Sequence, residues 1–142
     1  MNIKIKKLHQ AATTPTYGSV GAACFDLYSS KSGEVGAYSN SSFNTSLSFE
    51  IPDNHVMLVF SRSGHGFNSG ITLVNSVGVI DADYRGEVIV GLKNDSALRF
   101  DVNAGDRIAQ AMILTVKQVV FEDVQELSTT ERGVAGFGST GF

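Results

Sequence analysis

Tryptophan is absent from this sequence of 142 residues, proline occurs only twice, and Cys24 is the single cysteine. A lone cysteine excludes an internal disulfide, and with it the small disulfide-stabilised scaffolds of secreted proteins. It is typical instead of a protein of the reducing cytoplasm, which for a viral protein is the host cytoplasm. The shortage of proline beside 15 glycines favours many tight turns rather than disorder.

Long hydrophobic runs are also missing. No stretch of about 18 apolar residues occurs, so we expect no membrane-spanning helix and no membrane partner. The first residues alternate lysine with apolar side chains, as at Ile3 and Ile5, and lack the continuous apolar stretch of a signal peptide.

Positive charge is not in excess, because 11 basic and 14 acidic side chains give a net charge of −3. No nucleic acid is therefore expected as a partner, since binding a duplex requires a basic field. A phosphorylated ligand would have to be held by local groups, which indicates a small molecule. The length fits one domain, and 42% apolar with 18% charged residues are ordinary values for a globular protein.

The pattern of apolar residues predicts strands. Alternate positions are apolar or β-branched at Phe43, Thr45, Leu47, Phe49 and Ile51, and again at Leu98, Phe100 and Val102, before a turn at residues 103–106. Continuous apolar runs at Val56–Phe60, Val88–Leu92 and Ala111–Val116 predict strands that are buried on both faces. We expect one short helix at most, near Ser69–Ser76. The fold class is therefore all-β: a sandwich, a barrel or a jelly roll.

The last residues differ from the rest of the chain. From Ser128 to Phe142 the sequence has glycine at positions 133, 136, 138 and 141 and few apolar side chains, so it cannot bury much surface by itself. It nevertheless contains an arginine, an aromatic residue and several hydroxyls. We therefore predict a β core over residues 1–127 and, over residues 128–142, an arm that becomes ordered over a ligand. The alternative is a frayed terminus.

Two short segments contain candidate chemical groups. Arg62-Ser63-Gly64 follows a predicted strand, and its guanidinium, hydroxyl and unobstructed backbone N–H groups suit a polyphosphate, although such a triplet is also a common surface turn. Asp81 follows an apolar run and could act as a general base, or it could cap its own turn. An EF-hand calcium loop is excluded, because its twelfth position would be Leu92 rather than glutamate.

Several familiar sites are not supported. Neither Gly64-x-Gly66 nor the C-terminal glycines are expected to follow a strand and open a helix, as a Rossmann or P-loop motif would. The three histidines and Cys24 lack zinc-ligand spacing, and no Ser-His-Asp or Cys-His arrangement can be traced.

Five segments, in this order and spacing, resemble the motifs of the trimeric dUTPase family. They are Ala22–Leu27, Arg62–Gly66, Asn75–Gly86, Gly105–Gln110 and Arg132–Gly141. The resemblance covers roughly residues 20 to 142. Single motifs are weak, but the third and fifth together are highly specific: Gly-Val-Ile-Asp-Ala-Asp-Tyr-Arg-Gly and Arg-Gly-Val-Ala-Gly-Phe-Gly-Ser-Thr-Gly.

The resemblance implies a distorted jelly roll, also described as a β-clip, that assembles into a homotrimer with three sites built from several subunits. The implied activity is Mg²⁺-assisted hydrolysis of dUTP to dUMP and pyrophosphate, which limits uracil incorporation into DNA and supplies dUMP for dTTP synthesis. It further implies that Asp81 activates the water that attacks the α-phosphorus in line. Tyr84 would pack under the deoxyribose, where a 2′-hydroxyl would clash.

The remaining substrate contacts are likewise implied by the resemblance. Uracil would be read by Asn75 and by backbone groups at Gly78, Val79, Ile80 and Ile89. The phosphates would be contacted by Arg62, Ser63, Gly64 and Gln110. From the arm would come Arg132, Gly138, Ser139 and Thr140 at the γ-phosphate end, with Phe137 stacking on the base. Mg²⁺ would be held mainly by the triphosphate, and Asp26 would reach it through a water.

Three residues depart from the family pattern. Ser61 replaces a usual proline, His65 replaces an aliphatic residue and Cys24 replaces a glycine. None of them removes a polar catalytic group, and His65 near phosphates would add a pH-dependent charge. Two other functions remain as alternatives: a dCTP deaminase of the same superfamily, which requires a general-base glutamate, and a non-catalytic regulatory protein with this fold.

Overall fold

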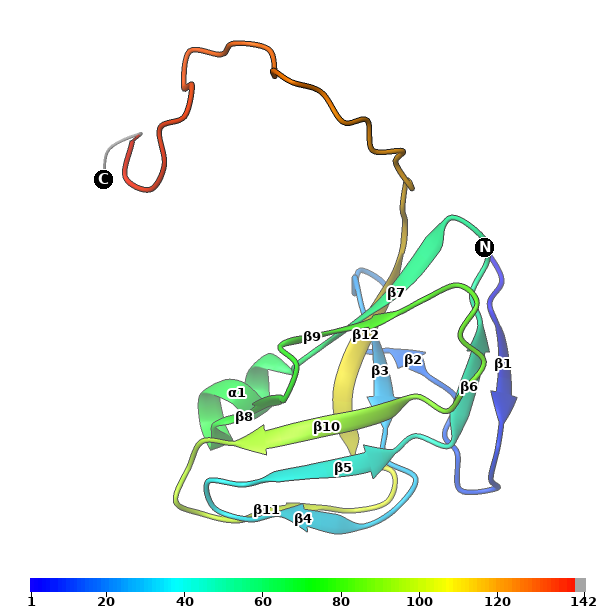
Figure 1. Ribbon diagram of the computed structural model, residues 1–142. Helices are drawn as coiled ribbons and strands as arrows, with labels where there is room; N and C mark the ends of the chain where they lie inside the picture. The colour runs from blue at the N-terminus through cyan, green and yellow to red at the C-terminus, as the bar shows by residue number, and fades with distance from the viewer. Residues whose placement is uncertain (140–142) are drawn as a thin grey trace.

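The structure, a computed structural model, describes residues 1–139. Antiparallel strands form nearly all of its regular structure (Figure 1). The elements are β1 (Lys4–Lys7), β2 (Thr16–Tyr17), β3 (Phe25–Tyr28), β4 (Gly33–Val35), β5 (Asn40–Asn44), β6 (Leu47–Glu50), β7 (His55–Phe60), α1 (Ser63–Ser69), β8 (Ile71–Leu73), β9 (Val77–Ile80), β10 (Ile89–Asn94), β11 (Phe100–Val102) and β12 (Arg107–Thr115). The predicted all-β class is confirmed.

The largest sheet has the strand order β2-β3-β12-β7-β9, and a second sheet has the order β5-β10-β8. Two further pairs, β1-β6 and β11-β4, complete the fold. The long strand β12 is central, because it pairs with β3 on one side and with β7 on the other. Gln110 on β12 therefore lies opposite both Asp26 on β3 and Phe60 on β7.

The core lies between these sheets. Side chains that are at most 1% exposed come from many of the strands and include Leu27, Leu47, Met57, Leu92 and Ile108. Each such large apolar side chain contributes roughly 1.5–3 kcal/mol relative to full exposure. The predicted buried face from Phe43 to Ile51 is confirmed, since its five alternate residues are all at most 5% exposed.

A kink divides that face into two strands. Ser46 has φ 53°, which ends β5 and sends the chain into β6. The Glu87 carboxylate accepts hydrogen bonds from the Ser46 backbone N–H at 2.7 Å and from Asn44 Nδ2 at 2.9 Å. The Thr45 hydroxyl donates to the Val88 carbonyl at 2.7 Å. These bonds fasten the start of β10 to the kink.

Three predictions about elements are wrong in part. The helix is α1 at Ser63–Ser69, whereas residues 71–73 of the predicted helix form strand β8. The apolar runs Val88–Leu92 and Ala111–Val116 are not buried on both faces within one chain, because Ile89 is 55% exposed and Leu114 is 44% exposed, whereas Val56–Phe60 has no exposed residue. Leu98 also departs from its predicted alternation, being 77% exposed.

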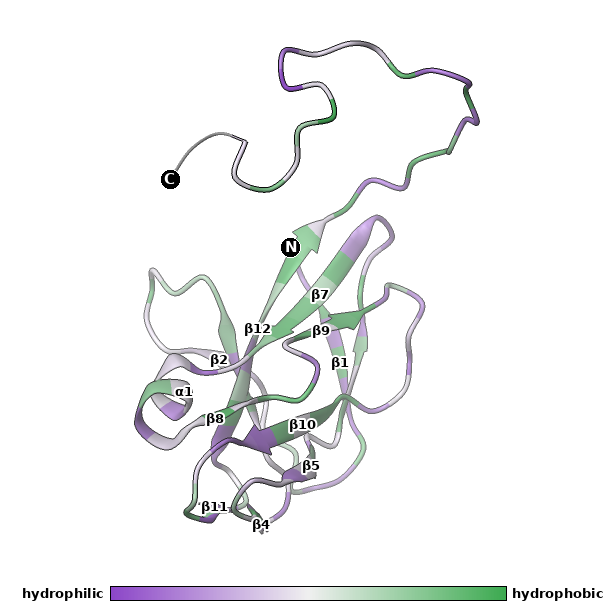
Figure 2. Cartoon of the chain, turned by 60° about the vertical axis from the view of Figure 1, so that its left-hand side comes forward, coloured by the Kyte–Doolittle hydropathy of each residue, from purple (hydrophilic) through white to green (hydrophobic). Residues whose placement is uncertain are grey.

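After Thr115 the described chain continues to residue 139 without helix or strand, and it runs away from the core (Figure 1). Polar and apolar residues mix along this extension (Figure 2). Its large apolar side chains are exposed, Val120 and Phe121 at 98% and 90%. The division of the chain at residue 128 stays a prediction. Within residues 1–139, no helix has the length and apolar character needed to cross a membrane.

Candidate active site

Three of the motif segments converge at one end of the largest sheet. The register of β12 places Gln110 between Asp26 and the end of β7, and Arg62 follows two residues after Phe60. Segments distant in the sequence thus contribute a carboxylate, a guanidinium and an amide to one place. The turn at residues 103–106 precedes β12 and is closed by a bond from the Asn103 N–H to the Asp106 carboxylate at 2.7 Å.

Asp26 is the centre of this cluster. It is 8% exposed, and its two carboxylate oxygens face two different arginines. Arg62 Nε donates to Oδ1 at 3.2 Å, and Arg107 Nη1 donates to Oδ2 at 3.3 Å. One carboxylate between two guanidiniums leaves one net positive charge, which suits a phosphorylated ligand. Arg107 has no role in the sequence-based prediction; its place in the fourth motif beside Gly105 and Gln110 is the only signal that marks it.

The loop that contains Arg62 is held from both sides by Ser61. The Ser61 carbonyl accepts a hydrogen bond from Gln110 Nε2 at 2.9 Å, and its hydroxyl accepts one from the Leu73 backbone N–H at 2.8 Å. Ser61 therefore connects β12 and β8 to the start of the Arg62-Ser63-Gly64 segment. Gln110 uses an amide N–H for this contact and keeps its side-chain oxygen for other partners.

Helix α1 begins directly after Arg62, whose carbonyl accepts from the Gly66 N–H at 3.1 Å, and it ends at Gly70 with φ 66°. Ser63 and Gly64 are exposed in its first turn. The expectation that Gly64-x-Gly66 does not follow a strand and open a helix is therefore wrong. A Rossmann or P-loop fold is excluded on other grounds, because those folds need parallel strands and the paired strands here are antiparallel.

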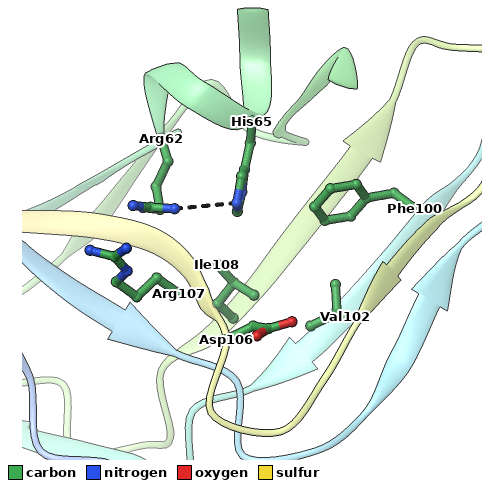
Figure 3. A pocket seen from close by; sticks show the side chains of 7 residues that line it. All are labelled: Arg62, His65, Phe100, Val102, Asp106, Arg107 and Ile108. Atoms are coloured by element: carbon green, nitrogen blue, oxygen red, sulfur yellow. Dashed lines mark hydrogen bonds between the residues drawn. The ribbon is translucent and has the colours of Figure 1, made fainter. Parts of the chain in front are cut away.

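A cleft of about 250 Å³ opens beside Arg62 (Figure 3). The His65 side chain points into it from α1, between Arg62 and Phe100, and Asp106 lies across the cleft. Arg62 Nη1 is 3.3 Å from His65 Nε2, and the imidazole packs edge-on against the Phe100 ring with 5.2 Å between centroids. Burial lowers the pKa of His65, the charge of Arg62 adds to this effect, and Asp106 opposes it.

The third motif forms strand β9 and the turn after it. β9 is an edge strand that pairs with β7 alone in its sheet. At Gly78 a Cβ would lie 3.1 Å from the Val59 Cβ, so glycine permits close contact with β7.

The Tyr84 N–H donates to the Asp81 carbonyl at 3.2 Å and its hydroxyl donates to the Glu87 carbonyl at 2.9 Å. A Cβ on Gly86 would overlap the Tyr84 phenol, so Gly86 leaves room for that ring. Asn75, Val79, Asp81, Tyr84 and Ile89 are exposed.

Asp81 and Arg62 lie far apart within one chain. Val77 pairs with Phe60 and Ile80 pairs with Met57, so Asp81 follows the end of β9 that is remote from Arg62. At roughly 3.3 Å per residue, the extended chain from Met57 on β7 to Arg62, two residues beyond the end of the strand, spans about 16 Å. The fold of one chain therefore gathers Asp26, Arg62, Arg107 and Gln110 but leaves Asp81 and Tyr84 outside this cluster.

The described part of the fifth motif lies on the extended segment, away from both groups (Figure 1). Arg132 donates to carbonyls of its own turn, from Nε to Ala135 at 3.2 Å and from Nη2 to Gly136 at 3.4 Å. Phe137 is fully exposed, and Gly138 has φ 77°. Ser139 is the last described residue, and Thr140 lies outside the described residues.

Residues 1–139 contain no group of three or more side chains arranged to hold a metal ion. As a ligand for a divalent cation Asp26 is suited to a minor part, because a carboxylate has about four lone-pair positions and the arginines occupy two of them.

The antiparallel fold and the arginine–carboxylate cluster define a class of small β proteins with a site for a phosphorylated ligand. A family model described as dUTPase matches residues 10–141. Deoxyuridine 5′-triphosphate nucleotidohydrolases of Helicobacter hepaticus and Nautilia profundicola are each 45% identical over 99% of this chain, covering 89% and 99% of those proteins. The chain belongs to the dUTPase family. Its activity is the family's reaction, hydrolysis of dUTP to dUMP, which makes it a dUTP diphosphatase.

Solved structures show the same fold. The Staphylococcus bacteriophage 80alpha dUTPase with dUPNHPP matches with a TM-score of 0.92 and 25% identity, covering 99% of both chains. A mutant dUTPase from phage phi11 of S. aureus, in which a structural Mg(II) ion is coordinated, matches with a TM-score of 0.83 and 22% identity over 89% of this chain and 98% of that one.

Proposed function

We propose that Asp81 holds the water that attacks the α-phosphorus of dUTP in line, with pyrophosphate as the leaving group. Asp81 is exposed at the end of β9, and within residues 1–139 no hydrogen bond or ion pair engages its carboxylate. A carboxylate within hydrogen-bond reach of a water can orient it and accept its proton as the new P–O bond forms. The accessible carboxylate of Asp81 is the observation that carries this proposal.

The uracil is recognised by the edge of β9. An edge strand presents unpaired backbone N–H and C=O groups, and these can pair with a base as they would with another strand. Asn75 lies before this strand, Gly78, Val79 and Ile80 lie on it, and Ile89 is exposed at the start of β10. Backbone groups that match uracil would be left unpaired by cytosine, which discriminates strongly against it. Tyr84 supports the deoxyribose and excludes a 2′-hydroxyl.

The phosphates bind to the cluster around Asp26. Arg62, Ser63, Gly64 and Gln110 supply a charged donor, a hydroxyl, an open backbone and an amide. From the arm, Arg132, Gly138, Ser139 and Thr140 bind the γ-phosphate end, and Phe137 stacks on the uracil. The exposure of Arg132 and Phe137 on the extended segment is consistent with residues that find their partners only when the arm closes.

The cofactor is Mg²⁺, held mainly by the triphosphate and reached by Asp26 through a water. Mg²⁺ retains several waters and uses few carboxylates, which fits a site with one buried acid. When bound, the ion would neutralise phosphate charge. The arginines on Asp26 orient the same phosphates. The lone thiol of Cys24 and the nucleotide substrate are consistent with a cytoplasmic enzyme.

The enzyme is a homotrimer whose sites combine residues of different subunits. One chain separates Asp81 from Arg62 by its register and directs the arm away from both. Exposed apolar side chains are also available for contacts between copies, including Val77 and Val79 on β9, Ile89 on β10, and Val119, Val120 and Phe121 on the extension. A second copy can thus provide the Asp81 that the cluster of the first one lacks.

The test is the Asp81→Asn variant, which keeps the shape of the side chain but cannot accept the water's proton. We expect kcat to fall at least about 100-fold, as for loss of a general base, while dUTP still binds. Pyrophosphate release with Mg²⁺ measures turnover, and calorimetry with a non-hydrolysable analogue measures binding. Asp83→Asn, two residues further along the same turn, is the matched control. A variant with near-normal kcat would remove Asp81 from this role.

A further inference from the structure

We propose that His65 is a positioning residue for Arg62: as a neutral imidazole it accepts a hydrogen bond from the guanidinium and fixes its orientation toward the nucleotide phosphates. The inference rests on the proposed role of Arg62 in phosphate binding. The structure places His65 Nε2 3.3 Å from Arg62 Nη1.

The chemistry of the pair determines which nitrogen has the proton. Arginine has donors only, so His65 Nε2 must accept, and the proton of a neutral ring must therefore be on Nδ1. Nδ1 is buried and has no hydrogen-bond partner within residues 1–139. The ring is held by packing instead, edge-on against Phe100 of β11 (Figure 3). Within residues 1–139, the contact with Arg62 is therefore the single hydrogen bond of the imidazole.

A neutral acceptor has a specific advantage at this place. Asp26 already accepts from Nε of Arg62 and offsets part of its charge. A second carboxylate would cancel the positive charge that attracts the triphosphate, whereas an imidazole fixes a second N–H and leaves the charge unchanged. Two of the five N–H groups of Arg62 are then used for orientation, and three remain for phosphate oxygens.

Protonation of His65 would remove this arrangement. An imidazolium cannot accept from Arg62, and the two adjacent cations would repel each other. The charged groups that face the ring are Arg62 from the loop before α1, and Asp106 and Arg107 from the start of β12. The two arginines disfavour the imidazolium and Asp106 favours it, and the arginines together with burial prevail, so that the pKa of His65 is lowered. The lowered pKa favours the neutral imidazole, which gains its proton at a more acidic pH than an ordinary histidine.

The experiment compares kcat and KM for dUTP between pH 5 and 8 in four forms: the wild type, His65→Leu, His65→Gln and Arg62→Ala. Leucine removes the acceptor, and glutamine places an oxygen near the position of Nε2 but cannot titrate in this range. At pH 7.5 we expect His65→Leu to raise KM about tenfold with a smaller change in kcat, and His65→Gln to recover most of the loss. The wild type should lose kcat/KM toward acid pH in a step that both His65 variants lack.

Two controls separate the possible failures. His9→Gln changes an exposed histidine of the N-terminal region and should keep the acid step. An unchanged KM in Arg62→Ala would refute the phosphate role of Arg62 itself. The inference about His65 alone would be refuted by a different pair of results. Arg62→Ala would have a raised KM, while His65→Leu would keep both the wild-type KM and the wild-type loss of kcat/KM toward acid pH. If His65→Leu does not fold, two measurements still test the inference. The pH profile of His65→Gln should lack the loss of kcat/KM toward acid pH, and the imidazole ¹⁵N shifts of the wild type should show the proton on Nδ1.

Discussion

Asp26 is the residue on which the phosphate cluster depends. Its carboxylate separates Arg62 and Arg107, so its loss would leave two guanidiniums close together without a counter-charge. We expect Asp26→Asn to lower the free energy of unfolding by roughly 1–2 kcal/mol, a value reduced by the half-exposure of Arg107. KM for dUTP should rise as well, because Arg62 loses its orientation. Urea unfolding and steady-state kinetics measure the two effects.

Glu34 offers a matched control for this prediction. Its carboxylate is 3.4 Å from Arg99 Nη1, and both side chains are more than half exposed. Exposed pairs contribute little, so Glu34→Gln should change stability by no more than about 0.5 kcal/mol and leave KM unaltered. Equal effects of the two substitutions would mean that the Asp26 cluster is an ordinary surface ion pair.

At the scale of elements, the extension after β12 carries the most specific prediction. Removal of residues 128–142 deletes Arg132 and Phe137, and the described part of this segment, residues 128–139, contains no strand and no core residue. The truncated chain should therefore keep the thermal unfolding temperature of the full chain within a few degrees while losing most of its kcat/KM. Differential scanning calorimetry and pyrophosphate release test both parts. A truncated enzyme with full activity would show that the arm is not a lid.

The elements also show what the sequence could and could not predict. The Phe43–Ile51 alternation was predictable, because a period of two is tied to a buried strand face. Helix α1 was not, since Gly64 and Gly66 give it a poor intrinsic propensity, and it is placed by the end of β7 and by the left-handed Gly70. The runs at Val88–Leu92 and Ala111–Val116 predicted two-sided burial, yet an apolar sequence does not tell a face in the core from a face that the single chain leaves exposed.

The site was predictable in its residues and not in its geometry. Asp26, Arg62 and Gln110 were identified by resemblance, but only the register of β12 shows that they are neighbours. The ion pair of Arg107 and the contact between His65 and Arg62 depend on side-chain positions that sequence spacing does not encode. The separation of Asp81 from this cluster was equally hidden, because it follows from the antiparallel pairing of β7 with β9.

For the whole molecule, that separation leads to a test by mixing two impaired variants, assayed at a dUTP concentration well below the KM of Arg62→Ala. Asp81→Asn retains the cluster of Asp26, Arg62, Arg107 and Gln110, and Arg62→Ala retains the Asp81 carboxylate. When the two are refolded together in equal amounts, random assembly would give about a quarter of the sites an intact Arg62 from one subunit and an intact Asp81 from another. We therefore expect activity to return to about a quarter of the wild-type level per site. Each variant refolded alone is the control and should stay well below that level. If both residues acted within one chain, no mixture could contain an intact site, and a mixture no more active than the two variants alone would show that the sites are not shared.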